Sequence, residues 1–187
     1  MNDNWKDNIV TMIYVKQELM KQDVCGILPH YFPEVAANNE DIRQAQISLG
    51  FQIDQCYSEF LKTANGWKGF FQTVDLFGTN ELSNPTIMQY VFSLLNAVEE
   101  CVVESTGFSR EDLLPFAATR FDKDLFVITK QSSHKPGTVI WLAGEEIDRY
   151  PTFEEFFLAM IDYNRLQIQN IQRINLTLIP TDFNTTE

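Results

Sequence analysis

The first part of the chain has the apolar spacing of an amphipathic helix. Between residues 4 and 21 the apolar positions recur at steps of three and four, so a helix with one apolar face is predicted there. That face holds Trp5, Ile9, Met12, Ile13, Leu19 and Met20. Residues 26–33 cannot continue as one helix, because Pro29 and Pro33 interrupt the segment.

Two shorter helices are predicted next. Asn39 opens the first, and Gly50 ends it in the manner of a helix-terminating glycine. Asp54 is positioned to cap the second helix, which ends at Asn65-Gly66. The apolar face of this second helix consists of Tyr57, Phe60 and Leu61.

After residue 66 the pattern changes from helix to strand. Aromatic and β-branched residues are dense between residues 70 and 77, which predicts one or two short strands. Four more strands are predicted at residues 113–118, 125–129, 138–143 and 146–150. Turn-forming residues such as Asp122-Lys123 separate them.

Two long helices complete the prediction. One of about twenty residues begins at Asn84-Pro85 and ends before Gly107, because its apolar steps of three and four continue without a break. After it, Ser109 has the character of a capping-box residue. The final helix begins at Pro151 and continues through about residue 172. Its apolar face holds Phe153, Phe156, Phe157, Met160 and Ile161.

Helices, then strands in series, then a helix indicate one α+β domain over residues 1–187. The expected architecture is a mostly antiparallel or mixed sheet packed with several helices. Residues 1–37 form an N-terminal helical extension in this interpretation, and residues 174–187 form a C-terminal tail that is partly mobile.

Charge narrows the classes of partner. The 187 residues include 14 Lys and Arg but 26 Asp and Glu, so the formal net charge is −12. This balance argues against binding nucleic acid, whose phosphates require basic residues, and against docking on anionic membranes. With 44% hydrophobic and 21% charged residues, the composition is that of a globular protein. The acidity therefore lies on a folded surface, for which a basic protein is the obvious partner.

The acids concentrate in two segments. Residues 99–112 contain five acids and one arginine, and so do residues 145–155. Each segment is either a solvated face that keeps the protein soluble or a docking surface for a partner. The candidate docking acids are Glu99, Glu100, Glu104, Glu111, Asp112, Glu145, Glu146 and Asp148.

Residue types that carry catalysis are sparse. No spacing typical of a zinc site or a phosphate-binding loop occurs. Cys25 and His30 could form a reactive pair, and Asp122 with Asp124 could bind a cation, but a buried thiol and a tight turn are the better explanations of these residues. We therefore expect a protein that is not an enzyme, with no catalytic residue, metal or cofactor.

The expected location is a reducing cytoplasm. Three cysteines lie far apart, the polar first residues are unlike a signal peptide, and no apolar run approaches the ~20 residues of a membrane helix.

Trp67 has two interpretations. It lies between two glycines and beside Phe70 and Phe71, where it either fills the core or stands exposed as an anchor for a partner.

Several blocks in order resemble the SUKH superfamily. Glu40-Asp-Ile-Arg and Leu49-Gly50-Phe51 resemble its opening helix, and Val139-Ile-Trp141 resembles its closing strand. The resemblance spans about residues 38–165. Two positions depart from the family pattern: Gln52-Ile53-Asp54 stands for its Leu-Pro, and Lys123-Asp124 for its Gly-Asp. The residues carried over as structural signatures are Gly50, Tyr57, Phe60, Leu61, Asn65, Gly66, Asp124, Phe153 and Phe156.

The resemblance implies binding. Bacterial members look like immunity proteins that neutralise polymorphic toxins, many of them nucleases, used in competition between cells. The implied partner is a cognate toxin domain that the protein occludes. The alternative is a regulatory module without a toxin, like the yeast relative that regulates cell-wall assembly. Neither interpretation specifies an oligomeric state.

Overall fold

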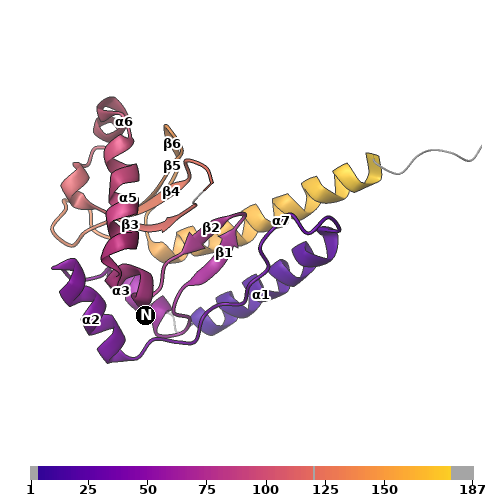
Figure 1. The fold of residues 1–187 in the computed structure, drawn as a ribbon, viewed down its shortest axis with the longest axis horizontal. Helices are drawn as coiled ribbons and strands as arrows, with labels where there is room; N and C mark the ends of the chain where they lie inside the picture. Colours follow the sequence, from indigo (N-terminus) through magenta and orange to yellow (C-terminus); the bar gives the residue numbers. More distant parts are fainter. Residues whose placement is uncertain (1–3, 120, 178–187) are drawn as a thin grey trace, which may run out of the picture.

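The computed structural model describes residues 4–119 and 121–177 (Figure 1). Its strands form one antiparallel sheet in sequence order, which confirms the predicted α+β fold. The strands are β1 (Trp67–Phe71), β2 (Val74–Leu76), β3 (Leu113–Ala118), β4 (Leu125–Thr129), β5 (Val139–Leu142) and β6 (Glu146–Tyr150). Each predicted strand is present.

The three predicted N-terminal helices are present, but the third ends at Leu61 and not at the predicted Asn65-Gly66. They are α1 (Trp5–Gln22), α2 (Asn39–Leu49) and α3 (Gln55–Leu61). The Asn38 side chain accepts hydrogen bonds from the backbone N–H groups of residues 40 and 41, and the Asp41 carboxylate reaches back to the Asn38 N–H. Gly50 ends α2 with φ 78°, a conformation that glycine adopts without steric cost.

The predicted long helix at residues 84–107 is wrong, because the chain breaks it at Val98. The segment forms α5 (Pro85–Ala97) and α6 (Glu100–Ser105), after an unpredicted short helix α4 (Thr79–Ser83). Val98 has extended backbone angles, φ −65° and ψ 134°. Arg110, which precedes β3, donates hydrogen bonds to the carbonyls of Leu95 and Val98. These bonds satisfy carbonyls that a continuous helix would have used itself.

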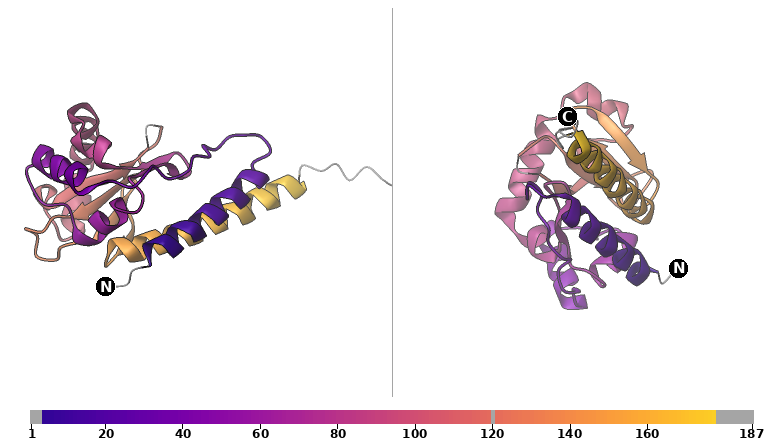
Figure 2. Two further views of the ribbon diagram at one scale, coloured as in Figure 1. Left: turned by 90° about the horizontal axis from the view of Figure 1, so that it is seen from below. Right: turned by 90° about the vertical axis from the view of Figure 1, so that its right-hand side faces the viewer.

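The last helix, α7 (Phe153–Thr177), is longer than predicted. Residues 174–177 therefore belong to a helix and not to a tail, while residues 178–187 lie outside the described residues. Figure 2 shows α1 and α7 side by side as they project from the body of the domain. The Trp5 ring contacts Phe153 and Phe157 with ring centroids 5.7 and 5.4 Å apart. The N-terminal extension is thus packed onto the end of the chain.

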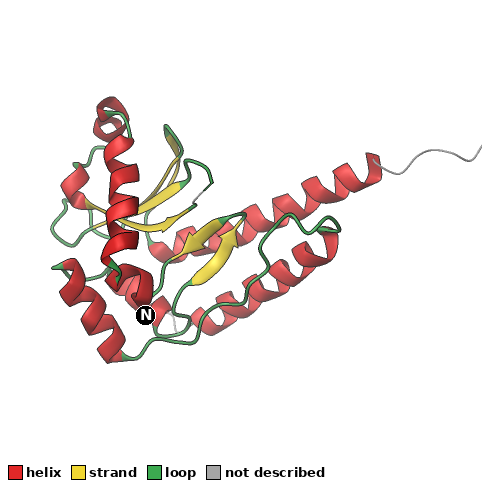
Figure 3. Ribbon diagram, in the orientation of Figure 1, coloured by secondary structure: helices red, strands yellow, loops and turns green. Residues whose placement is uncertain are grey.

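Helices cover both faces of the sheet (Figure 3). On one face, Phe156 of α7 packs against Phe116 and Phe126 at centroid distances of 5.3 and 5.4 Å. On the other face, α5 contacts β3 and β4. Because strand side chains alternate between the two faces of a sheet, successive residues of one strand pack against helices on opposite faces.

The edge strand β1 is covered by the paired helices. The Lys16 Nζ of α1 donates to the carbonyl of Gly69 at 2.6 Å. From α7, the Asn164 side-chain amide donates to the carbonyl of Phe70 at 3.3 Å. An exposed sheet edge invites pairing with other chains, and these two side chains occupy backbone acceptors of that edge.

Candidate functional site

The two acidic segments meet in space although residues 113–144 separate them in the sequence. Arg149 of β6 donates a hydrogen bond to the carbonyl of Thr106, just after α6, at 2.8 Å. The same guanidinium lies over the Phe108 ring, 5.8 Å from its centroid. We call the resulting surface the acidic end. It consists of Glu99, Glu100, Glu104, Glu111, Glu145 and Glu146.

Arginines neutralise part of the acidic end. Arg110 forms an ion pair with Glu100. Arg149 donates two hydrogen bonds to Glu146, both at 2.7 Å, and this contact raises the pKa of the guanidinium. The other four acids, which form no salt bridge with another described residue, are all exposed: Glu99, Glu104, Glu111 and Glu145. The unpaired charge of this surface therefore comes from those four.

Asp148 does not belong to the acidic end. The register of β5 and β6 shifts between Trp141 and Leu142, and this bulge places Glu146 beside Arg149. Asp148 lies toward α7 instead, where it accepts hydrogen bonds from the hydroxyls of Tyr150 and Tyr163 at 2.8 and 3.2 Å. The pKa of Tyr150 is raised, mainly by burial and secondly by the neighbouring Asp148 carboxylate. Asp148 therefore connects β6 with α7.

Asp112 has a local structural role. It accepts hydrogen bonds from the backbone N–H and the hydroxyl of Ser109, at 3.0 and 2.8 Å. These bonds lower the pKa of the Asp112 carboxyl. The hydrogen bonds between Ser109 and Asp112 close the predicted turn before β3, so the Asp112 carboxylate stabilises that turn.

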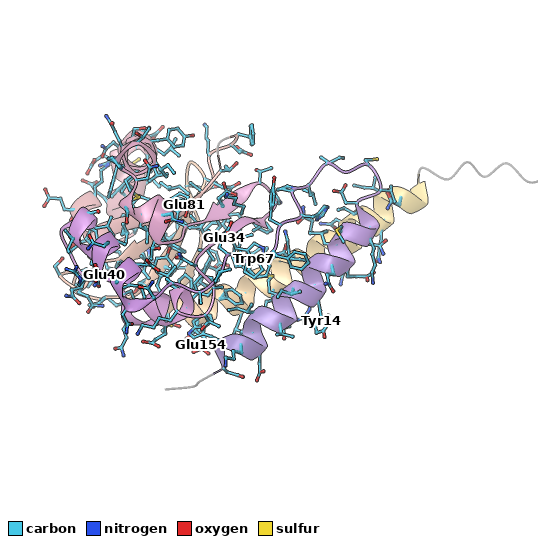
Figure 4. All side chains as sticks on the ribbon, turned by 60° about the horizontal axis from the view of Figure 1, so that its bottom comes forward. Tyr14, Glu34, Glu40, Trp67, Glu81 and Glu154 are labelled. Atoms are coloured by element: carbon cyan, nitrogen blue, oxygen red, sulfur yellow. The ribbon has the colours of Figure 1, made fainter. Side chains whose placement is uncertain are left out.

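The interpretation of Trp67 as an exposed anchor is wrong. Only 1% of the residue is exposed, and its indole N–H donates to the carbonyl of Tyr31 at 2.8 Å. The ring packs on Phe70 with centroids 5.9 Å apart. Figure 4 shows Trp67 between the body and α1, whereas Tyr14 points away from the body. The alternative, that Trp67 fills the core, is confirmed.

The signature residues are structural. The Asn65 side chain accepts from the Thr79 N–H at 2.7 Å and donates to the Thr79 hydroxyl at 2.9 Å, which fixes the start of α4. At Gly66, with φ 91°, a Cβ atom would come within 2.5 Å of the Gly78 nitrogen, so only glycine fits. The other signature residues lie in the core or next to it: Tyr57, Phe60, Leu61, Phe153 and Phe156 are buried, and Asp124 accepts from the Trp141 indole at 2.7 Å.

The side chain that His30 contacts is Asp23, and not Cys25 as the suggested reactive pair requires. His30 Nε2 lies 2.9 Å from the Asp23 carboxylate, which also accepts from the N–H groups of Ile27 and Leu28. His30 and Asp23 therefore shape the turn that follows α1, and Cys25 is exposed.

Neither a metal-binding cluster nor a membrane-spanning helix occurs among the described residues. Across residues 4–119 and 121–177, no three His, Cys, Asp or Glu side chains come together in a group that could hold a metal ion. In the same part of the chain, every helix is too short or too polar to cross a membrane.

A groove was missed by reasoning from sequence. A cavity of about 510 Å³ lies between α5 and the strands β2 and β3, and Tyr90 and Ile87 form its outer wall. One signal was available: Tyr90 is an aromatic residue that falls outside the apolar stripe of its helix, so packing against the core does not explain it.

A protein-family model matches most of the chain. Residues 36–159 match the SMI1/KNR4 family (SUKH-1), which confirms the resemblance seen in the sequence. The match covers about two thirds of the chain; it begins after α1 and ends within α7. No curated protein matches the chain.

Proposed function

Since this chain belongs to the SMI1/KNR4 family (SUKH-1), we propose that it is an immunity protein that binds and neutralises a cognate toxin domain. Family membership supports a toxin-immunity-type or SMI1-like protein. The choice of the toxin-immunity type rests on one observation, the meeting of two distant acidic segments at one end of the domain. The protein works by binding in the cytoplasm, without catalysis.

Charge explains why such a surface suits a toxin. A nuclease toxin carries basic residues that hold phosphates. A surface with the opposite charge speeds the encounter of the two proteins and aligns them before contact. Glu99, Glu104, Glu111 and Glu145 supply that charge without a salt-bridge partner among the described residues. A bound domain of this size covers the basic site of a nuclease and keeps its substrate out.

A regulatory module of the SMI1 type is the second candidate. The family description itself favours it, because it names SMI1 and KNR4. Such a module would bind a partner other than a toxin, and its gene would have no toxin gene beside it. The two functions are separated by expressing this chain with the protein domain encoded by the neighbouring gene.

The decisive experiment measures protection and complex formation together. Cells expressing the neighbouring gene's C-terminal domain are expected to survive when this chain is co-expressed, and a tagged chain is expected to capture that domain. Unaltered killing, with no complex in the pull-down, would reject the toxin-immunity function and leave the regulatory one.

A charge-reversal variant tests the docking surface. Glu99→Lys, Glu104→Lys and Glu145→Lys together are expected to slow association by roughly tenfold at low salt, and added salt is expected to shrink the difference. The matched control reverses three exposed acids outside both segments, Asp7→Lys, Asp122→Lys and Asp162→Lys, for the same change in net charge. Equal association rates of the two variants would reject the acidic end as the docking surface.

A further inference from the structure

The groove beside α5 has an apolar interior that side chains of the domain leave open. Its floor consists of the buried residues Phe77, Val91 and Ala118, and Ile87 and Tyr90 form a wall. Tyr90 lines the groove and is 42% exposed, so part of this residue is accessible to a bound group. The cavity volume of about 510 Å³ is within the range of ligand-binding pockets and exceeds the volume of any single side chain.

The rim of the groove carries two carboxylates that the backbone holds in place. Asp75 accepts from the Gly69 N–H at 2.8 Å, and Glu81 accepts from the Gly78 N–H at 3.0 Å. Each bond uses one oxygen, and the second oxygen of each carboxylate has no hydrogen bond to another described residue. Two fixed acceptors therefore stand beside an apolar cavity.

One cation also lies on the rim, but an acid faces it. The Lys68 Nζ is 3.9 Å from the Glu34 carboxylate, which belongs to the segment before α2. With this pair counted as neutral, Asp75 and Glu81 leave the rim with an excess of two negative charges. The groove therefore favours a positively charged occupant with an apolar body.

We propose that this groove receives an arginine side chain that a basic protein partner presents on an apolar loop. Arginine satisfies every part of the site. Its methylene stem suits the apolar floor, its planar guanidinium can lie on the Tyr90 ring, and its several donors match the open oxygens of Asp75 and Glu81. A lysine has a compact ammonium that gains less from a flat ring and two separate carboxylates.

The proposal rests on the proposed function and gives it an anchor. Interfaces gain most of their affinity from a few buried anchors, whereas charges at the rim tune the rate of association. Trp67 cannot be that anchor, because it is buried. The groove lies beside the first half of α5, and the acidic end begins where α5 ends. A 13-residue helix spans roughly 20 Å, which one interface of ordinary size covers.

The first test uses the full chain and a small probe, so it does not depend on the partner. N-acetyl-arginine amide at millimolar concentration is expected to shift the backbone amide resonances of Ile87, Tyr90 and Ala118. The uncharged isostere N-acetyl-citrulline amide is expected to shift them at least about threefold less at the same concentration. Shifts that are absent, equal for the two probes or located away from the groove would overturn the proposal.

Two variants and a matched control locate the binding. Tyr90→Ala removes the ring, and Glu81→Gln removes the charge while its amide oxygen can still accept from Gly78. Each is expected to weaken binding of the arginine probe at least about threefold. Tyr14→Ala removes another exposed helical tyrosine, outside the family match, and is expected to bind like the wild type. Wild-type binding by both groove variants would refute the assignment.

The same variants in the toxin assay separate the two proposals. Tyr90→Ala is expected to weaken the complex with the neighbouring gene's domain by about tenfold or more, mainly through faster dissociation. If the wild type binds that domain and Tyr90→Ala binds it equally tightly, the groove proposal fails and the proposed function stands. If the wild type binds the arginine probe in the groove but not that domain, the proposed function fails and the guanidinium site stands.

Discussion

Lys16 places an ammonium group in the contact between α1 and the edge strand β1. Only 5% of the residue is exposed, and its Nζ donates to the Gly69 carbonyl at 2.6 Å. Burial lowers the pKa of this lysine from 10.5 to about 8, because the charged form loses its hydration. We predict that the contribution of this group to the stability of the domain increases with pH in the alkaline range.

The magnitude follows from the pKa difference. Below pH 8 the lysine is protonated in both states, and the folded state bears the full cost of burying the charge. That cost is about 3 kcal/mol, since each pKa unit is worth about 1.4 kcal/mol. As the pH rises from 8 to 10.5, the folded protein loses the proton while the unfolded chain still holds it. The contribution of Lys16 to the free energy of unfolding therefore rises by about 3 kcal/mol over this window.

The assay compares urea unfolding of the wild type and of Lys16→Met between pH 7 and pH 10.5, with reductant present. Methionine keeps the length of the side chain but has no charge, so the titration of every other group cancels in the difference between the two proteins. Relative to the variant, the wild type is expected to gain about 3 kcal/mol across the window. Lys6→Met, which removes an exposed ammonium of the same helix, is the control and is expected to change stability by less than about 0.5 kcal/mol. Parallel curves for the wild type and Lys16→Met would refute the argument.

Two further substitutions test single hydrogen bonds through the free energy of unfolding in urea. Tyr57→Phe removes the buried hydroxyl that donates to the Phe77 carbonyl, and a loss of about 1–3 kcal/mol is expected because that carbonyl stays buried. Asn38→Ala removes the cap of α2, for which about 1 kcal/mol is expected. The control Asn38→Asp keeps a side chain that can cap α2, so its free energy of unfolding is expected to stay within about 0.5 kcal/mol of the wild-type value. Wild-type stability of Tyr57→Phe or of Asn38→Ala would contradict the role assigned to that bond.

Local signals in the sequence were sufficient for most elements of the fold. The Asp54 cap lies within three residues of the N–H group that it satisfies, so local spacing predicts it. The break at Val98 could not be predicted, because the apolar period continues through it. Its cause, the bonds from Arg110 to carbonyls of α5, joins residues twelve and fifteen positions apart.

The candidate site depended more strongly on contacts between distant residues. Both acidic segments were visible as composition, but their meeting depends on Arg149 reaching Thr106 across 43 positions. The separation of Asp148 from Glu146 comes from a bulge, which changes the face to which the following side chains point. A tryptophan beside two glycines has the same local sequence pattern whether it is buried or exposed. Trp67 is buried because α1 and the segment around Tyr31 cover it, and these contacts come from residues distant in the sequence.

The pairing of α1 with α7 has a consequence for synthesis of the protein. The ribosome makes α1 first, with Met12 and Leu19 on the face that is fully buried in the finished domain. The partner of that face is the last helix, and residues 23–152 separate the two. At 5–20 residues per second the nascent α1 waits roughly 7 to 26 seconds before synthesis of α7 begins. During that time its apolar face is open to chaperones and to other nascent chains, and the domain closes only after α7 has been made.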